Sequence, residues 1–134
     1  MKKQDLQKFV VEYQLVDQQI KVLQQQLVLL EQQATETAAL IDNLESLKNV
    51  KARTKAFAQL GPGMSVETTV NEPSHVLVNV GANTIVKKTL PEAQNMLHTQ
   101  IEEIKKITEK MHAEIQRLLG HAQQLRHEIQ KVSA

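Results

Sequence analysis

Hydrophobic residues in the first third of the chain recur at alternating steps of three and four residues. The series runs over twelve positions from Leu6 to Leu44, and eleven of them are apolar or Tyr, with Thr37 as the exception. Such a seam exceeds the roughly three to four heptads that make a coiled coil credible. Gly and Pro are absent before position 61, where helix-favouring Gln, Leu, Glu, Lys and Ala abound. The pattern predicts one long helix over residues 1–54.

The last third of the chain repeats this spacing from Leu97 to Val132, and Thr108 is the only polar member. The segment Thr89-Leu90-Pro91-Glu92 has the form of a capping box with Pro in the first turn, so we expect a second helix over 90–134. Gly120 lies off the seam and should weaken this helix by about 1 kcal/mol without ending it. Two seams of similar length predict an antiparallel pair, in which the numbers of facing residues sum to about 138 and the chain ends lie together.

The middle segment, residues 55–89, is rich in Val, Thr and turn residues. We expect strands over 56–60, 64–70, 75–80 and 84–88, arranged as two hairpins with turns at 61–63 and 81–83. Four short strands cannot build an independent core, and their edges are open, so we expect them to pair with strands of other subunits. The predicted fold is therefore α+β, a single domain over 1–134 in which the hairpins serve assembly.

Composition narrows the classes of function. Hydrophobic residues make up 41% of the chain but aromatic residues only 2%, and 17 residues are Gln, which disfavours an ordinary compact core. The absence of Cys excludes disulfides and thiolate sites and favours a cytoplasmic location. A net charge of +1 gives no electrostatic reason to expect nucleic acid or an anionic membrane. No apolar run approaches the roughly 18 residues of a membrane span, and the first residues lack the apolar stretch of a signal peptide.

No catalytic chemistry emerges from the side chains. His121 and His127 are six residues apart and do not share a helical face, and the glutamates alternate with basic residues as on a solvated helix surface. Gly61-Pro62-Gly63 lacks the Lys-Ser/Thr of a phosphate-binding loop and is interpreted as a turn. We therefore expect no catalytic residue, metal or cofactor, and predict that the protein is not an enzyme.

Three stretches resemble the alpha-class subunits of prefoldin, a family of chaperones: residues 57–63, residues 76–83 and residues 88–93. Two hairpins between the helices separate the alpha class from the beta class, which resembles it but carries one. The resemblance implies a hexamer of two alpha and four beta subunits, whose hairpins assemble into a β-barrel platform. It also implies that non-native client proteins are held at the coiled-coil tips without nucleotide and passed to a group II chaperonin. The Gln-rich surface and lack of Cys look more like an archaeal member.

Two sets of residues are candidate sites. The first, which we call the tip set, would bind clients. The alternative is that its members only close the seam between the helices. The tip set consists of Leu6, Phe9, Val10, Tyr13, Leu125, Ile129 and Val132. The second, which we call the assembly set, would be buried between subunits. The alternative is that its members form a hairpin core within one chain. The assembly set consists of Val66, Val70, Val76, Val78, Val80, Ile85 and Val86.

A second class of function remains open at this point. The chain can also be a structural spacer or adaptor whose hairpins oligomerise and whose helices act as a rigid rod. Hydrophobicity at the chain ends distinguishes the two, because a spacer would end in polar caps, whereas apolar seam residues here continue to Val132.

Overall fold

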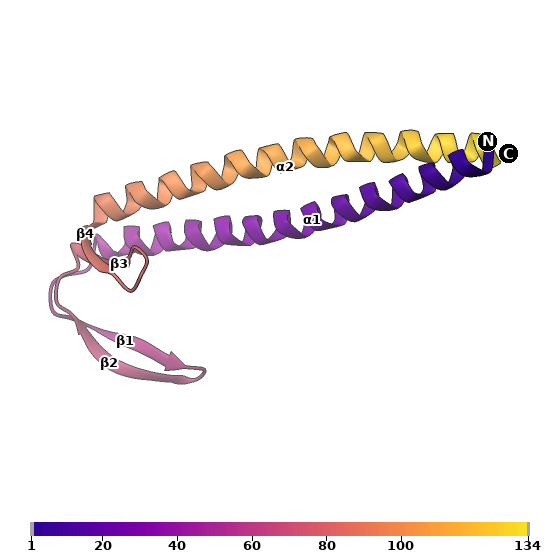
Figure 1. Cartoon of the computed structure of the whole chain (residues 1–134). Helices are drawn as coiled ribbons and strands as arrows, with labels where there is room; N and C mark the ends of the chain where they lie inside the picture. Colours follow the sequence, from indigo (N-terminus) through magenta and orange to yellow (C-terminus); the bar gives the residue numbers. More distant parts are fainter. Residues whose placement is uncertain (1, 134) are drawn as a thin grey trace. The chain divides into compact units, whose positions relative to one another are not determined.

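Two β-hairpins follow one long helix and precede another in a computed structural model of the protein, which describes residues 2–133 (Figure 1). The elements in order are α1 (Lys2–Leu47), β1 (Thr54–Gly61), β2 (Met64–Val70), β3 (His75–Asn79), β4 (Ile85–Thr89) and α2 (Leu90–Ser133). The predicted α+β class and element order are confirmed. Met1 and Ala134, which the predicted helices included, lie outside the described residues.

The chain divides into two compact units. The terminal unit comprises residues 2–34 and 102–133, and the hairpin unit comprises Thr35–Ile101. Each unit contains a stretch of both helices, and in the terminal unit the first turns of α1 lie beside the last turns of α2 (Figure 1). The predicted single domain over 1–134 stays a prediction.

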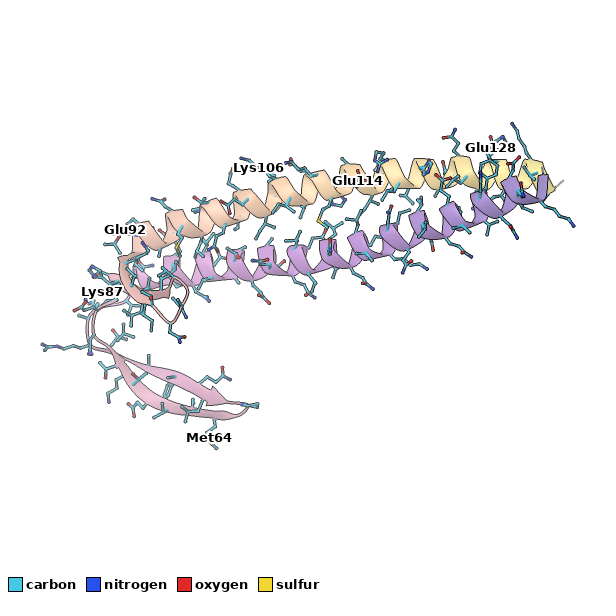
Figure 2. The ribbon with its side chains drawn as sticks, viewed as in Figure 1. Met64, Lys87, Glu92, Lys106, Glu114 and Glu128 are labelled. Atoms are coloured by element: carbon cyan, nitrogen blue, oxygen red, sulfur yellow. The ribbon has the colours of Figure 1, made fainter. Side chains whose placement is uncertain are left out.

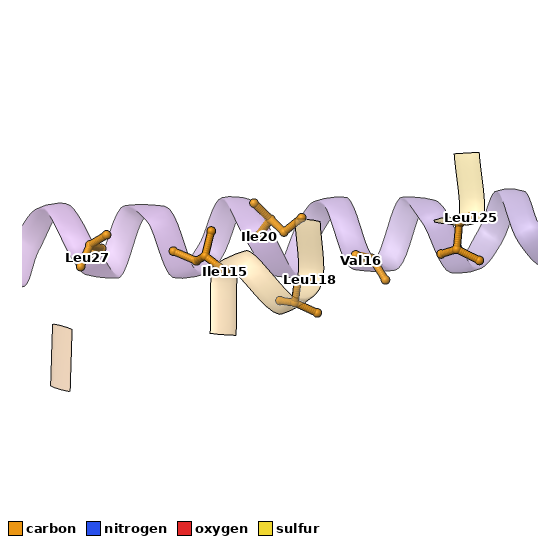
Figure 3. Packing of buried hydrophobic residues seen from close by; sticks show 6 residues of the cluster. All are labelled: Val16, Ile20, Leu27, Ile115, Leu118 and Leu125. Atoms are coloured by element: carbon orange, nitrogen blue, oxygen red, sulfur yellow. The ribbon is translucent and has the colours of Figure 1, made fainter. Parts of the chain in front are cut away.

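Seam residues form the core of the terminal unit. The buried cluster consists of Val16, Ile20, Leu27, Ile115, Leu118 and Leu125 (Figure 3). All six occupy predicted seam positions. None of the described side chains is completely buried, because a pair of helices encloses a single layer of side chains. This geometry explains why Leu, Ile and Val suffice and aromatic volume is hardly needed.

Contacts between the two helices are consistent with the antiparallel register expected from the sequence. His121 Nε2 lies 3.1 Å from Glu12 Oε1 in the terminal unit, and Gln94 Nε2 donates to Glu45 Oε2 over 2.9 Å in the hairpin unit. The residue numbers of these pairs sum to 133 and 139, on either side of the expected 138. The antiparallel register is therefore near the one that the two seams define.

A second cluster fills the hairpin unit where α1 ends and α2 begins. It consists of Leu44, Leu90, Ala93 and Leu97, with Ile41, Leu47 and Val76 packed against it. Leu90 and Ala93 lie in the first turn of α2, so the start of this helix is fixed by packing as well as by its cap.

The prediction that the first helix reaches residue 54 is wrong, because α1 ends at Leu47. In the helix register, Leu47 lies level with Leu90, the first residue of α2, so a longer α1 would have no partner helix. The next two seam positions also hold Lys48 and Lys51, which end the apolar pattern. Residues 48–53 form turns instead, and Arg53 takes a left-handed backbone conformation with φ of 64°.

The predicted cap of α2 is confirmed. Thr89 Oγ1 accepts a hydrogen bond from the Glu92 backbone N–H at 3.2 Å and donates one to Glu92 Oε1 at 2.9 Å. The Leu90 N–H donates to the Ser74 carbonyl at 3.2 Å, which ties the loop between the hairpins to the helix start. Two of the otherwise unpaired N–H groups of the first turn are thereby satisfied.

Both hairpins form, with small shifts of their strand ends. β1 pairs with β2 and β3 with β4, each antiparallel and in separate two-stranded sheets. β1 starts at Thr54, two residues before the prediction, and includes Gly61, which leaves Pro62 and Gly63 as the turn. Gly63 has φ of 72°, as the third residue of a type II turn requires. β3 ends one residue early and β4 is shifted by one, because Thr84 belongs to the turn, where its N–H donates to the Gly81 carbonyl at 2.9 Å.

Gly120 lies inside α2, which continues through it as predicted. A Cβ added there would meet no atom within 4 Å. We expect Gly120→Ala to raise the free energy of unfolding by about 1 kcal/mol, because Ala restricts the unfolded chain and favours the helix. Urea denaturation followed by helical circular dichroism measures this change. The exposed Ala113→Gly in the same helix should show a loss of similar size, and equal stability of Gly120→Ala and the original chain would contradict the expectation.

Candidate functional site

The tip set gathers in the terminal unit, as its members come from the first turns of α1 and the last turns of α2. Leu125 is buried, with 5% of its surface exposed, and the other six members are half-buried. Phe9 and Tyr13 pack against the buried cluster. The set therefore closes the seam and at the same time leaves part of its apolar surface open.

Further exposed apolar residues lie on α1 of the same unit and belong to neither of the two predicted site sets. Val11, Leu15, Val22 and Leu29 are 55%, 56%, 47% and 65% exposed. The last three recur every seven residues, each immediately before a seam residue. This doubled apolar pair per heptad widens the apolar stripe of α1 beyond the seam.

One flank of the helix pair carries a groove of about 620 Å³, built only from terminal-unit residues. Leu23 and Leu118 of the seam lie at its base, and Leu15, Val22 and three glutamines line the α1 side. On the α2 side, Arg117 Nε donates to Glu114 Oε2 over 3.0 Å, which pairs both charges. We call this side the glutamine flank.

The opposite flank of the terminal unit is charged. Asp17 and Glu31 follow the seam residues Tyr13 and Leu27 by four residues, whereas Gln19 and Gln26 of the glutamine flank follow Tyr13 and Ile20 by six. Asp17 forms an ion pair with Lys21 at 3.1 Å, and Glu31 Oε1 lies 4.0 Å from His112 Nε2. The α1 lining of the groove on the glutamine flank carries no charged side chain, and the two charges of its α2 lining, Glu114 and Arg117, pair with one another.

The β1–β2 hairpin exposes almost all of its residues. Its strands pair Ala58 with Val66 and Thr54 with Val70, so Ala58, Val66 and Val70 share one apolar face. The other face carries the Lys55–Glu67 ion pair at 3.5 Å. Side chains project from both sides of this hairpin, and Met64 marks its end (Figure 2). Nothing in the described residues covers the apolar face.

Members of the assembly set take different positions in the β3–β4 hairpin. Val76 packs against the helix cluster of the hairpin unit and Val78 is half-buried, so Val76 serves the core of its own chain. Ile85 lies on the other face and is 63% exposed, next to Leu77 at 72%. The exposed side chains Phe57, Leu60, Met64 and Leu77 were missed, because strand alternation alone does not tell which face a helix covers.

An apolar groove of about 590 Å³ lies within the hairpin unit. Leu40, Leu44 and Met96 line it from the helices, and Val76 and Val78 line it from β3. The groove borders the open edge of β3, since that strand pairs only with β4. This part of the chain thus offers both apolar surface and free backbone groups for strand pairing.

Glu45 joins α1 to α2 at the start of the second helix. Hydrogen bonds from Lys48 and then from Gln94 hold the pKa of the Glu45 carboxyl below its usual value. A carboxyl whose pKa is lower in the folded state stabilises the fold above its unfolded pKa, and this stabilisation is lost as the pH falls through the folded pKa. We expect acidification below about pH 4 to lower the melting temperature of the original chain more than that of Glu45→Gln. Thermal melts of both proteins at neutral pH and below about pH 4 test this. An equal fall in melting temperature for the two proteins would contradict it.

Within residues 2–133, no group of three His, Asp or Glu side chains could hold a metal ion. No helix in the same range is long and apolar enough to cross a membrane.

Comparisons with known proteins agree on one family. The family described as "Prefoldin subunit" matches residues 16–134. Prefoldin subunit alpha of Methanoculleus marisnigri is 32% identical over 122 residues, covering 91% of this chain and 79% of the relative. The Archaeoglobus fulgidus subunit alpha is 25% identical over 125 residues, covering 93% and 91%.

A solved structure has the same fold. A chain of the filamentous PFD from Methanocaldococcus jannaschii, determined by cryo-EM, superimposes with a TM-score of 0.75 at 21% identity. The match covers 86% of this chain and 95% of that one. With the family match over residues 16–134 and the relatives described above, the chain belongs to the prefoldin family of chaperones, as an alpha-class subunit.

Proposed function

We propose that this subunit is an ATP-independent holdase, which captures unfolded proteins at the tip set and delivers them to a group II chaperonin. The observation that carries the proposal is the half-open seam of the terminal unit. Six of the seven tip residues keep part of their apolar surface exposed, and two of them are the aromatics Phe9 and Tyr13. Apolar side chains of this kind bind many sequences, because burial of apolar area is not directional.

Assembly is the second part of the proposal. The uncovered apolar face of β1–β2 and the open edges of both hairpins fit burial against beta-class subunits in a hexamer of two alpha and four beta chains, with the hairpins closing a β-barrel. Prefoldins form oligomers with other subunits. Such a complex would act in the cytoplasm.

The size of the tip surface favours a weak and multivalent grip. About 200 Å² of apolar area at ~25 cal/mol/Å² contributes at most about 5 kcal/mol before costs. Association and ordering consume most of that, so one tip binds poorly. Several tips on one platform can raise the overall affinity by ~10²–10⁴. Each contact remains weak and reversible, so release to a chaperonin needs no nucleotide hydrolysis.

Light scattering from a chemically denatured client tests the holdase activity. The chain is mixed with a beta-class prefoldin subunit, native mass confirms the complex, and the client is then diluted into it. The complex should suppress client aggregation in proportion to its concentration. Assembly without any suppression would support the alternative, a structural spacer that oligomerises through its hairpins.

A further inference from the structure

We propose that the glutamine flank is a binding groove for an amphipathic α-helix of the client, which would lie along the helix pair as a third helix. The inference deepens the proposed function and rests on it, since it names the kind of client segment that this subunit takes. It concerns residues outside the tip set.

The spacing of the exposed side chains favours a helical occupant. Leu15, Val22 and Leu29 recur every seven residues and stand beside the seam residues Val16, Leu23 and Leu30. This period of seven is the period at which a second helix presents its own apolar residues in coiled-coil packing. The stripe spans about 21 Å at ~1.5 Å per residue, or about four helical turns. A β-strand repeats its side chains every two residues and cannot follow this stripe.

The base of the groove continues an interface that already exists. Leu23 and Leu118 belong to the seam that joins the two helices, and both also line the groove. A third helix placed there would extend the existing packing and would need no rearrangement of the pair. Ile107 of α2, 47% exposed, occupies the same heptad position as Glu114 and adds apolar surface on this flank.

The charges around the groove select against a partner of strong net charge. On α1 the polar lining consists of Gln18, Gln19 and Gln26, and on α2 Glu114 and Arg117 neutralise one another. The other flank carries the charged pairs of Asp17 and Glu31. An apolar stripe bordered by glutamines and one neutralised ion pair accepts helices of many sequences, as a chaperone requires.

The small size of the groove argues against a second copy of the chain as its occupant. Nine residues line it, whereas a stable protein interface uses roughly 20–30 residues a side. A contact of this size suits a transient ligand that is exchanged rapidly. The occupant we commit to is therefore a client helix of about 14 residues with one apolar face.

Fluorescence anisotropy with a labelled peptide tests the proposal on the full chain. The probe is a peptide about three heptads long with Leu at the a and d positions and Gln, Glu and Lys elsewhere. Its control has the same length and composition, but its Leu residues occupy alternate positions of one central segment, the pattern of a strand. We expect the heptad peptide to bind about tenfold more tightly than the alternating one, with little change on adding salt.

Two matched variants locate the site. Leu15→Ser with Val22→Ser should weaken binding of the heptad peptide about tenfold. Val28→Ser with Leu119→Ser removes two exposed apolar side chains from the charged flank and should change it by less than about twofold. Equal binding of the two peptides, or equal effects of the two variants, would overturn the proposal. A smaller oligomer of the Leu15/Val22 variant in sedimentation would also overturn it, in favour of a second copy.

Peptide binding and suppression of client aggregation, measured on the same complex, separate this inference from the proposed function. Suppression of client aggregation together with unselective peptide binding would leave the holdase in place and remove the helix groove. Selective peptide binding by a complex that never suppresses aggregation would retain the groove and remove the holdase.

Discussion

Replacing Val66 by Asp is expected to prevent the chain from entering a complex with beta-class subunits, while both helices stay folded. Val66 lies on the apolar face of β1–β2, which is uncovered in the single chain, so the free subunit tolerates the charge. In the proposed assembly the carboxylate would be buried without a partner, at a cost of about 3–5 kcal/mol. This weakens association by roughly 10²–10⁴-fold.

Native mass spectrometry after mixing with a beta-class subunit measures this loss. Thr69→Asp is the matched control, because Thr69 lies on the same strand but on the polar face, paired with Lys55. It adds the same charge and should assemble normally. If Val66→Asp assembles as well as Thr69→Asp, the apolar face of this hairpin is not an interface between subunits.

Exchange of Phe9, Val10 and Tyr13 for Ser is expected to reduce client capture by an order of magnitude or more without disturbing assembly. The three side chains contribute partly open apolar surface at the start of α1. Client capture depends on several weak contacts that act together. Weakening the contact at one type of tip therefore lowers the overall affinity for the client by more than the loss measured at a single tip. Suppression of aggregation by the assembled complex gives the measurement.

The packing role of the same residues has to be measured separately. Phe9 and Tyr13 contact the buried cluster, so the triple variant should also loosen the first turns of α1. Helical circular dichroism reports this effect, and Val28→Ser provides an exposed substitution that leaves the seam intact. If the triple variant fails to assemble, these residues serve the stability of the subunit and its complex. If client capture is unchanged, they are not the client site.

The seam residues are an example of features that could be predicted from the sequence. Alternating steps of three and four selected Val16, Ile20 and Leu118, all of which are buried, because a helix that pairs with another can hide only one stripe. Thr89 and Glu92 likewise identified the start of α2, since capping depends on neighbouring residues alone. These features follow from local chemistry and from the repeat of the helix.

Other features could not be predicted from the sequence, because they depend on contacts between elements that are distant along the chain. The helix-forming composition of residues 48–53 favoured a longer α1, but the position where α2 begins removed its partner. Val76 and Ile85 were placed in one set, yet they lie on opposite faces of the β3–β4 hairpin, and only Val76 meets the helices. Strand alternation gives two faces without telling which of them is covered.

Taken alone, the sequence determined the two helices, their paired seam, the hairpins and the family, because heptad spacing, capping and turn chemistry are all written in short-range patterns. The tertiary structure decided where α1 ends, which hairpin face is covered, and that Leu15 and Val22 border a groove whose base is the seam. Each of these depends on which surfaces meet when the chain folds back on itself, and burial of an apolar side chain is settled only by the element that comes to lie against it.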